Sequence, residues 1–207
     1  MKPCARLLLL SAAMLVVGCG STPPRERYYS MAPVQAAAPG GSATVITRRV
    51  VVGPVSVPES INRVELVVRR GEHRLELLEL QRWAALPTSE VAHATAQALE
   101  AALADPATRV MVDSATIGPA AAQRVVIDVQ RFDALLGQSL AFDASWRVLD
   151  TKGVLLASGQ TRVVEAAKAS ADSAVNGEAE AVAAAAGRAI GQMARQIATA
   201  LPAAPRP

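Results

Sequence analysis

The 207-residue sequence predicts an α/β domain that follows an N-terminal export signal. Apolar and polar residues alternate over several short segments, which is typical of strands, and two longer segments repeat apolar residues at helical spacing. The composition, 51% hydrophobic and 19% charged, is that of a chain that buries a core. At about 100–200 residues per domain, the length favours one domain.

The N-terminus has the pattern of a secretory signal. Lys2 and Arg6 precede an apolar run from Leu7 to Val17, which is the order of regions in a signal peptide. This run is shorter than the about 20 apolar residues that cross a bilayer. We therefore expect residues 1–18 to be a cleaved signal peptide.

The residues after this run, Val16-Val17-Gly18-Cys19, resemble the lipobox of bacterial lipoproteins. The resemblance implies cleavage before Cys19 and attachment of lipid, including palmitate, to its thiol and new amine. Two or more acyl chains hold a protein firmly on a membrane, whereas one binds reversibly. Gly20 stands where Asp signals inner-membrane retention in the enteric sorting scheme, so the resemblance implies the periplasmic face of the outer membrane.

We expect four regions along the chain. After the signal peptide, residues 19–43 form a lipidated N-terminus and linker rich in small residues and proline, with a brief strand at residues 28–31. Residues 44–201 form the single domain, and the proline-rich residues 202–207 form a flexible tail.

The first half of the domain contains three expected strands and a helix. β-Branched residues predict a strand over 44–57, interrupted at Gly53-Pro54, where a bulge or an edge position is expected because proline cannot donate a ladder hydrogen bond. Shorter strands are expected at 64–69 and 75–80. Residues 87–90 (Pro-Thr-Ser-Glu) mark a helix start, with a hydroxyl near the cap, and the helix runs to about residue 103.

The second half is expected to form strands and a final helix. A strand at 109–112 precedes a meander over 124–132, 140–149 and 154–164, whose connections have hairpin chemistry. The last helix is expected over 173–201. Its apolar stripe indicates either packing on the sheet or, because it contains small residues, an oligomer contact.

Residues that could perform catalysis are sparse. His73 and His93 have no cysteine or second histidine at ligand spacing. Neither a Gly-x-Ser-x-Gly elbow nor a glycine-rich phosphate loop is present. We expect no enzyme activity, no metal and no cofactor, and the formal net charge of +3 is too small for a nucleic-acid partner.

Three aromatic residues lie outside the periodic segments: Tyr28, Tyr29 and Trp83. Two interpretations stay open for them. They pin their segments onto the domain, or they serve a partner surface.

The ordered motifs resemble the PqiC-type (YmbA-type) auxiliary lipoproteins of ABC-like and MCE-type transport systems. After Cys19 the matching segments are Tyr28-Tyr29-Ser30-Met31, Val52-Gly53-Pro54-Val55-Ser56-Val57-Pro58-Glu59, Ile61-Asn62-Arg63, Val67-Val68-Arg69, Arg82-Trp83-Ala84, Arg131-Phe132-Asp133 and Ala144-Ser145-Trp146. The resemblance implies an α/β sandwich with a mixed, largely antiparallel sheet and two main helices.

The same resemblance implies a non-catalytic subunit that docks an MCE-domain tunnel carrying phospholipid between membranes and that forms a homo-oligomeric ring. The candidate partner-binding residues are then Tyr28, Tyr29, Arg63 and Trp83. The alternatives are a stand-alone lipid-binding lipoprotein, with a pocket lined by leucine or valine, and a hydrolase, with His93 beside a serine and a carboxylate.

Overall fold

The computed structural model describes residues 25–32, 45–113, 123–169 and 177–202. Cys19, residues 173–176 of the expected last helix and most of the expected tail lie outside these residues. The described elements are β1 (Arg27–Tyr29), β2 (Arg48–Ser56), β3 (Glu65–Arg69), β4 (Leu75–Trp83), α2 (Pro87–Leu103), β5 (Thr108–Val112), β6 (Gln123–Leu135), β7 (Ser139–Leu149), β8 (Leu155–Ala166) and α3 (Gly177–Ala200).

Two mixed sheets pack with α2 and α3, which confirms the expected α/β sandwich with mixed strand pairing and two main helices, although the strands divide between two sheets and not one. The larger sheet has the strand order β5-β2-β6-β7-β8, and the smaller has the order β1-β4-β3. Pairs β1–β4, β2–β5 and β2–β6 are parallel, whereas β3–β4, β6–β7 and β7–β8 are antiparallel. The meander expected from the sequence is therefore present as β6, β7 and β8.

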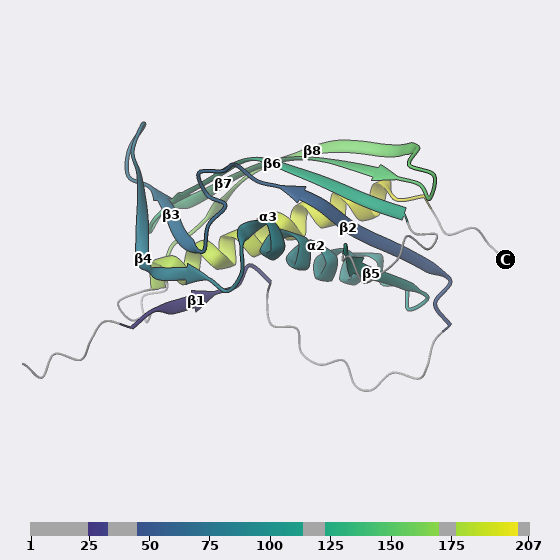
Figure 1. Cartoon of the computed structure of the whole chain (residues 1–207), viewed down its shortest axis with the longest axis horizontal. Helices are drawn as coiled ribbons and strands as arrows, with labels where there is room; N and C mark the ends of the chain where they lie inside the picture. The colour runs from purple at the N-terminus through teal and green to yellow at the C-terminus, as the bar shows by residue number, and fades with distance from the viewer. Residues whose placement is uncertain (1–24, 33–44, 114–122, 170–176, 203–207) are drawn as a thin grey trace, which may run out of the picture.

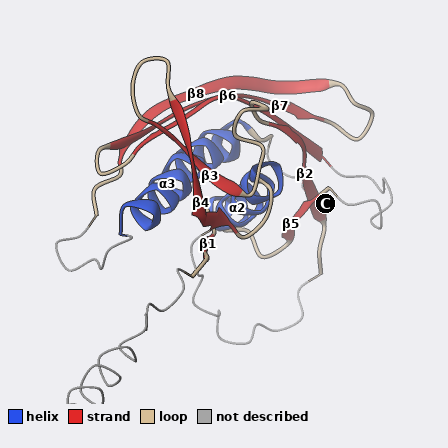
Figure 2. Ribbon diagram, turned by 60° about the vertical axis from the view of Figure 1, so that its left-hand side comes forward, coloured by secondary structure: helices blue, strands red, loops and turns tan. Residues whose placement is uncertain are grey.

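The larger sheet arches over both helices, and the hairpin of β3 and β4 stands at one end of the molecule (Figures 1 and 2). Alternation explains the packing: Val125, Ile127 and Val129 of β6 are buried, while the intervening residues are more exposed. On the helices, Leu99 of α2 and Ile190 of α3 are fully buried in the same core.

Several expected boundaries change. The ladder between β2 and β6 shifts register between Val52 and Val55, which confirms the bulge at Gly53-Pro54, although β2 is an internal strand. β4 extends to Trp83. The expected hydroxyl cap of α2 is wrong, because Leu86 is the N-cap residue and no side chain caps it.

The segment expected to be a linker also contributes to the fold. β1 pairs in parallel with β4, from Arg27 opposite Gln81 to Tyr29 opposite Trp83. Met31, just beyond β1, is 1% exposed. The brief strand expected near residue 28 is therefore present, and the folded part of the chain includes residues that precede residue 44.

Candidate partner-binding site

The small sheet brings the four candidate residues to one end of the molecule. Tyr28 and Tyr29 lie on β1 opposite Arg82 and Trp83 of β4. On the other side of β4, the Trp83 amide donates to the carbonyl of Val64 at 2.7 Å, so Arg63 lies beside the same strand end. With strands about 4.8 Å apart, three segments distant in sequence meet within two strand spacings.

Tyr28 stands on the solvent side of this sheet within a charged network. The residue is 61% exposed, and its hydroxyl donates to Glu26 at 2.6 Å. Arg82 bridges the sheet, with Nη1 2.7 Å from Glu26 and Nη2 3.1 Å from Glu65. The hydrogen bond from the Tyr28 hydroxyl lowers the pKa of Glu26 most, and the bond from Arg82 lowers it further. The bond between Tyr28 and Glu26 also raises the pKa of Tyr28.

Arg63 is exposed in the turn before β3. Its backbone amide donates to the carbonyl of Ile61 at 2.8 Å. Within the described part of the chain, its guanidinium makes no hydrogen bond or ion pair. Tyr28 and Arg63 are thus the two candidates with side chains available to a partner, and tyrosine and arginine are the residue types enriched at the centres of interfaces.

Trp83 does not belong to that surface. Its side chain is 3% exposed and meets Phe132 edge to face, with ring centroids 6.1 Å apart, while Phe132 meets Phe142 in the same way at 6.5 Å. Tyr29 is half-buried and donates to Gln81 at 2.6 Å. Of the two interpretations of the aromatics, pinning a segment onto the domain therefore fits Trp83 and Tyr29.

A second set of contacts between the two sheets lies beside these rings and was not predicted from the sequence. Asp133 on β6 accepts hydrogen bonds from Arg69 of β3 at 2.6 and 3.0 Å and from Arg131 at 2.8 Å. Desolvation raises the pKa of Asp133, but the hydrogen bonds from both arginines outweigh it, so the net pKa lies below its ordinary value. Arg131 and Asp133 belong to one short motif, but nothing in the sequence places Arg69 beside it.

The residues after β1 form a strap, residues 30–32, that is fixed to both helices. Glu90 of α2, 7% exposed, accepts from the Ser30 hydroxyl at 2.8 Å and from the Met31 amide at 2.9 Å. A Cβ at Gly187 of α3 would lie 2.6 Å from the Met31 carbonyl oxygen. Glu90 therefore acts as a clamp that holds Ser30 and Met31 against α2. Its position at the start of a helix did not indicate this role.

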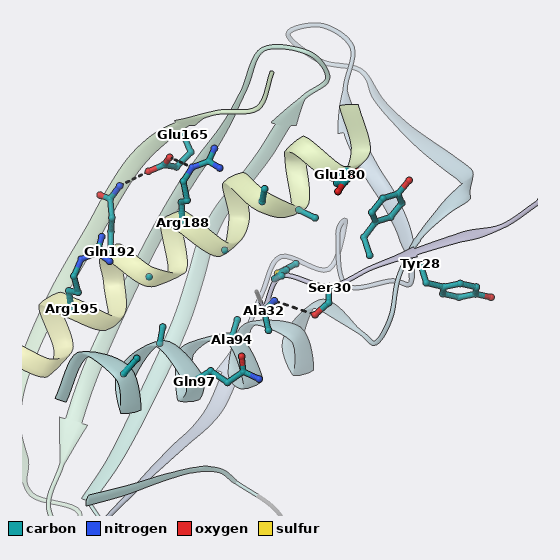
Figure 3. Close-up of a pocket in the computed structure, with 18 of the residues that line it drawn as sticks. Tyr28, Ser30, Ala32, Ala94, Gln97, Glu165, Glu180, Arg188, Gln192 and Arg195 are labelled. Atoms are coloured by element: carbon teal, nitrogen blue, oxygen red, sulfur yellow. Dashed lines mark hydrogen bonds and ion pairs between the residues drawn. The ribbon is translucent and has the colours of Figure 1, made fainter. Parts of the chain in front are cut away.

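An open groove of about 1,250 Å³ lies between α2 and α3, bounded by the strap (Figure 3). Alanines and glycines from both helices form much of its lining: Ala94, Ala98, Ala101, Ala102, Gly177, Ala183, Ala184, Gly187 and Gly191. Polar side chains, among them Gln97, Arg188 and Arg195, also line it. This lining differs from the leucine- or valine-lined pocket expected of a lipid carrier.

The expected hydrolase arrangement is only partly approached. Ser89, His93 and Asp113 line one hollow of about 360 Å³. No hydrogen bond joins these three described residues, and the carboxylate of Asp113 is bonded to Arg124 instead, so the nucleophile–base geometry is missing. His73 lies elsewhere, exposed beside Glu72, and the described residues contain no cluster suited to a metal.

Among the described residues, neither helix has the length and apolarity needed to cross a bilayer. Cys19 lies outside the described residues, so its lipidation stays a prediction.

Comparison with known proteins gives a family and a fold. A model of the family described as "ABC-type transport auxiliary lipoprotein component" matches residues 29–198. A comparison with curated proteins finds no significant match.

Two solved structures share the fold. An uncharacterized protein is 14% identical with a TM-score of 0.60, over 84% of this chain and 99% of its own. A DUF330 protein from Xanthomonas campestris is 19% identical with a TM-score of 0.56, over 83% of this chain and 92% of its own. At these identities, both likenesses concern the fold alone.

Proposed function

Because the chain belongs to the family of ABC-type transport auxiliary lipoprotein components, we propose that it docks the MCE-domain protein of an intermembrane phospholipid transport system. In this role it is a non-catalytic subunit, anchored through Cys19 to the periplasmic face of the outer membrane, and it supports membrane integrity. Several copies form a ring that receives the end of the MCE tunnel.

The observation that carries this proposal is the solvent face of the small sheet. Tyr28 is exposed there beside the ion pairs of Arg82, and Arg63 is exposed in the turn that leads into β3 of the same sheet. β1 is also the described strand closest in sequence to the proposed anchor at Cys19. A partner bound at this face is therefore held close to the membrane.

A partner-binding experiment tests the docking role. The lipidated protein and variants Tyr28→Ala and Arg63→Ala are co-purified with the MCE-domain protein of the same transport system. Each substitution removes a side chain of a type that dominates interface energetics, so we expect the affinity to fall about tenfold.

Val45→Ala is the matched control, because Val45 is 80% exposed and lies three residues before β2. β2 begins at the end of the molecule away from the small sheet (Figure 1). This variant should bind as the parent does. Equal binding by all four proteins, or no association of the parent, contradicts the proposed role.

One property of the groove, its size, favours a second candidate, a lipid-binding lipoprotein that works without a transporter, whereas its alanine and glycine lining does not. Its volume, about 1,250 Å³, is above the usual range of small-molecule sites. If this protein still supports membrane integrity fully in cells that lack the MCE-domain protein, the result favours this alternative over docking.

A further inference from the structure

The last strand of the large sheet, β8, leaves a long open edge. It ends the strand order β5-β2-β6-β7-β8, so β7 is the only described strand that pairs with it. The strand has 12 residues and runs along the rim of the large sheet (Figure 1). Such an edge offers unpaired amides and carbonyls to a strand of another chain unless proline, lysine or a covering segment blocks it. β8 contains neither proline nor lysine.

Alternate residues of β8 direct their backbone groups to this edge. Just beyond the strand, the Ala167 amide donates to the Gln138 carbonyl and continues the ladder with β7. From 158 to 166, odd-numbered residues therefore face β7 and even-numbered residues face away from it. The Ala166 carbonyl agrees, because it accepts a hydrogen bond from Arg188 of α3, outside the sheet. The even-numbered residues are also the exposed ones.

A second open edge lies on β4. β1 pairs with this strand only at Gln81–Trp83, so residues 75–80 have β3 on one side and no described strand on the other. β4 also bends at the register shift of its ladder with β3, so its first part stands away from β1 (Figure 1). This part of the strand is therefore open to a further strand.

The hydrogen bonds of the β3–β4 hairpin show which residues reach this second edge. The Arg70 amide donates to the Arg74 carbonyl at 2.9 Å, so even-numbered residues of β4 near the turn face β3. Leu75 and Leu77 consequently direct their backbone groups to the open edge. Both leucines are exposed, and so is the next odd-numbered residue, Glu79.

An antiparallel pairing of the two edges matches both charge and apolar surface. If Val164 of one copy stands opposite Leu77 of a second copy, both backbones present their free groups to each other, as a ladder requires. Val164 is 71% exposed, the highest value among the exposed large apolar residues of β8, and this register covers it with an apolar side chain. In the same register, Arg162 stands opposite Glu79.

Arg162 and Glu79 each lack an opposite charge within the described residues. The guanidinium of Arg162 donates to the amide oxygen of Gln160 at 3.2 Å and has no carboxylate within ion-pair distance there. Glu79 makes neither a hydrogen bond nor an ion pair in that part of the chain. Opposite charges directly across from each other stabilise a strand pair, and like charges destabilise it. A second copy therefore supplies the missing partner of each residue.

Two unlike edges also suit a ring, whereas one edge paired with itself does not. A contact between unlike surfaces passes from copy to copy and closes where the rotation allows it. β8 against β8 gives only a two-fold dimer, and the register that covers Val164 with Leu156 leaves Arg162 without a carboxylate. The proposed anchor holds all copies on one membrane, so a short ladder forms at a raised effective concentration.

We propose that β8 of one copy adds to the open edge of β4 of the next copy in antiparallel order. Val164 then lies opposite Leu77. Arg162 lies opposite Glu79 and forms an ion pair with it. The inference rests on the proposed function for the existence of a ring, and it names the two surfaces that join the copies. The docking residues on the solvent face of the small sheet are not part of this contact.

Cysteine crosslinking of the full-length lipoprotein in membranes tests this register. Cys4 and Cys19 are the only cysteines of the chain, so after signal cleavage and acylation an introduced pair has no competing thiol. Val164→Cys and Leu77→Cys in one chain place two Cβ atoms about 4.5–5.5 Å apart across the proposed ladder, and a disulfide can close that distance. Mild oxidation should link copies into a series of dimers, trimers and larger species.

Two further cysteine pairs are the controls. Val164→Cys with Val45→Cys should give no series, because Val45 is exposed but belongs to neither edge. Val164→Cys with Leu156→Cys reports on the two-fold alternative. A crosslink in that variant that stops at the dimer overturns the proposal, and so does the absence of a series from the variant with Val164→Cys and Leu77→Cys.

Charge exchange probes the same contact in the crosslinking background. Arg162→Glu sets two carboxylates opposite each other and should lower the crosslinked fraction at least about fivefold, and Glu79→Arg should do the same. The two substitutions together should restore it. Arg147→Glu is the matched control, because Arg147 is exposed on the same face of the neighbouring β7, and it should change nothing. If the exchange does not restore the crosslink, the proposed register is wrong.

Co-purification of the MCE-domain protein separates this contact from docking. A protein that binds the MCE-domain protein but forms no crosslinked series contradicts the edge contact and leaves docking in place. A crosslinked series without any binding of the MCE-domain protein supports the edge contact and contradicts docking.

Discussion

At the scale of single residues, the junction between the two sheets depends on one carboxylate and three rings. Trp83, Phe132 and Phe142 form a continuous edge-to-face series from β4 to β7. Beside them, Asp133 holds Arg69 of the small sheet and Arg131 of the large one. Both features fix the orientation of the small sheet, which carries Tyr28 and follows the turn that contains Arg63.

The substitution Asp133→Asn should destabilise the protein in a pH-dependent manner. Hydrogen bonds to charged groups contribute about 1.5–3 kcal/mol, so the free energy of unfolding at pH 7 should fall by about 2 kcal/mol. Since the folded-state pKa of Asp133 is lowered, its stabilisation is complete above the ordinary aspartate pKa of about 3.9 and is lost as the pH falls through the folded-state value.

Urea unfolding of parent and variant between pH 7 and pH 3 measures this difference. The difference between the two free energies should begin to shrink as the pH falls below about 3.9. The exposed Glu59→Gln is the control and should follow the parent. A difference that stays constant over the whole pH range contradicts the assigned role of Asp133.

At the scale of elements, hydrogen bonds hold β1 and the strap to the rest of the domain as one continuous segment. The carbonyl of Tyr29 accepts from the Ala84 amide at 2.7 Å, and Glu90 holds Ser30 and Met31. Because the proposed anchor precedes this segment, any pull from the membrane reaches α2 and α3 through it.

Releasing the clamp should loosen this segment without unfolding the domain. Glu90→Ala leaves the Met31 amide without its acceptor, and such a loss costs about 1–3 kcal/mol. Amide hydrogen exchange at residues 27–32 should therefore accelerate at least about fivefold.

Glu100→Ala, on the same helix but in an exposed pair with Arg109, should leave that exchange unchanged, since surface ion pairs contribute about 0–1 kcal/mol. Exchange at residues 27–32 that is equal in Glu90→Ala and in the parent would show that Glu90 does not hold the strap.

Sequence periodicity was sufficient for the elements whose pattern is local. β6 and β7 follow from strict alternation, and α3 follows from its apolar stripe. The pairing of β1 with β4 was not predictable, because its register joins Tyr29 to Trp83 across more than fifty intervening residues.

For the site, the sequence singled out Tyr28 and Arg63 but not their surroundings. Trp83 was a candidate surface residue, and its burial depends on Phe132, which lies on another sheet. The groove was also not predictable, because it arises from the relative placement of α2 and α3 and not from the pattern of either helix.

At the scale of the whole molecule, the position of each feature can be described relative to the proposed anchor at Cys19. β1 and the small sheet stand at the end nearest in sequence to Cys19, and the strap and groove follow on the helical layer, with the larger sheet covering its other side (Figure 2). The proposed docking surface therefore lies at the end of the molecule that carries β1, the described strand nearest in sequence to Cys19. The proposed position of the protein at the membrane depends on acylation of Cys19.

The most direct measurement is therefore acylation of Cys19 together with the membrane to which the protein fractionates. Cells grown with radioactive palmitate should yield a labelled protein that sediments with the outer membrane, because two or more acyl chains make attachment stable. Cys19→Ser should abolish the label and the outer-membrane association. An unlabelled parent, or a Cys19→Ser protein that still sediments with the outer membrane, would contradict the account.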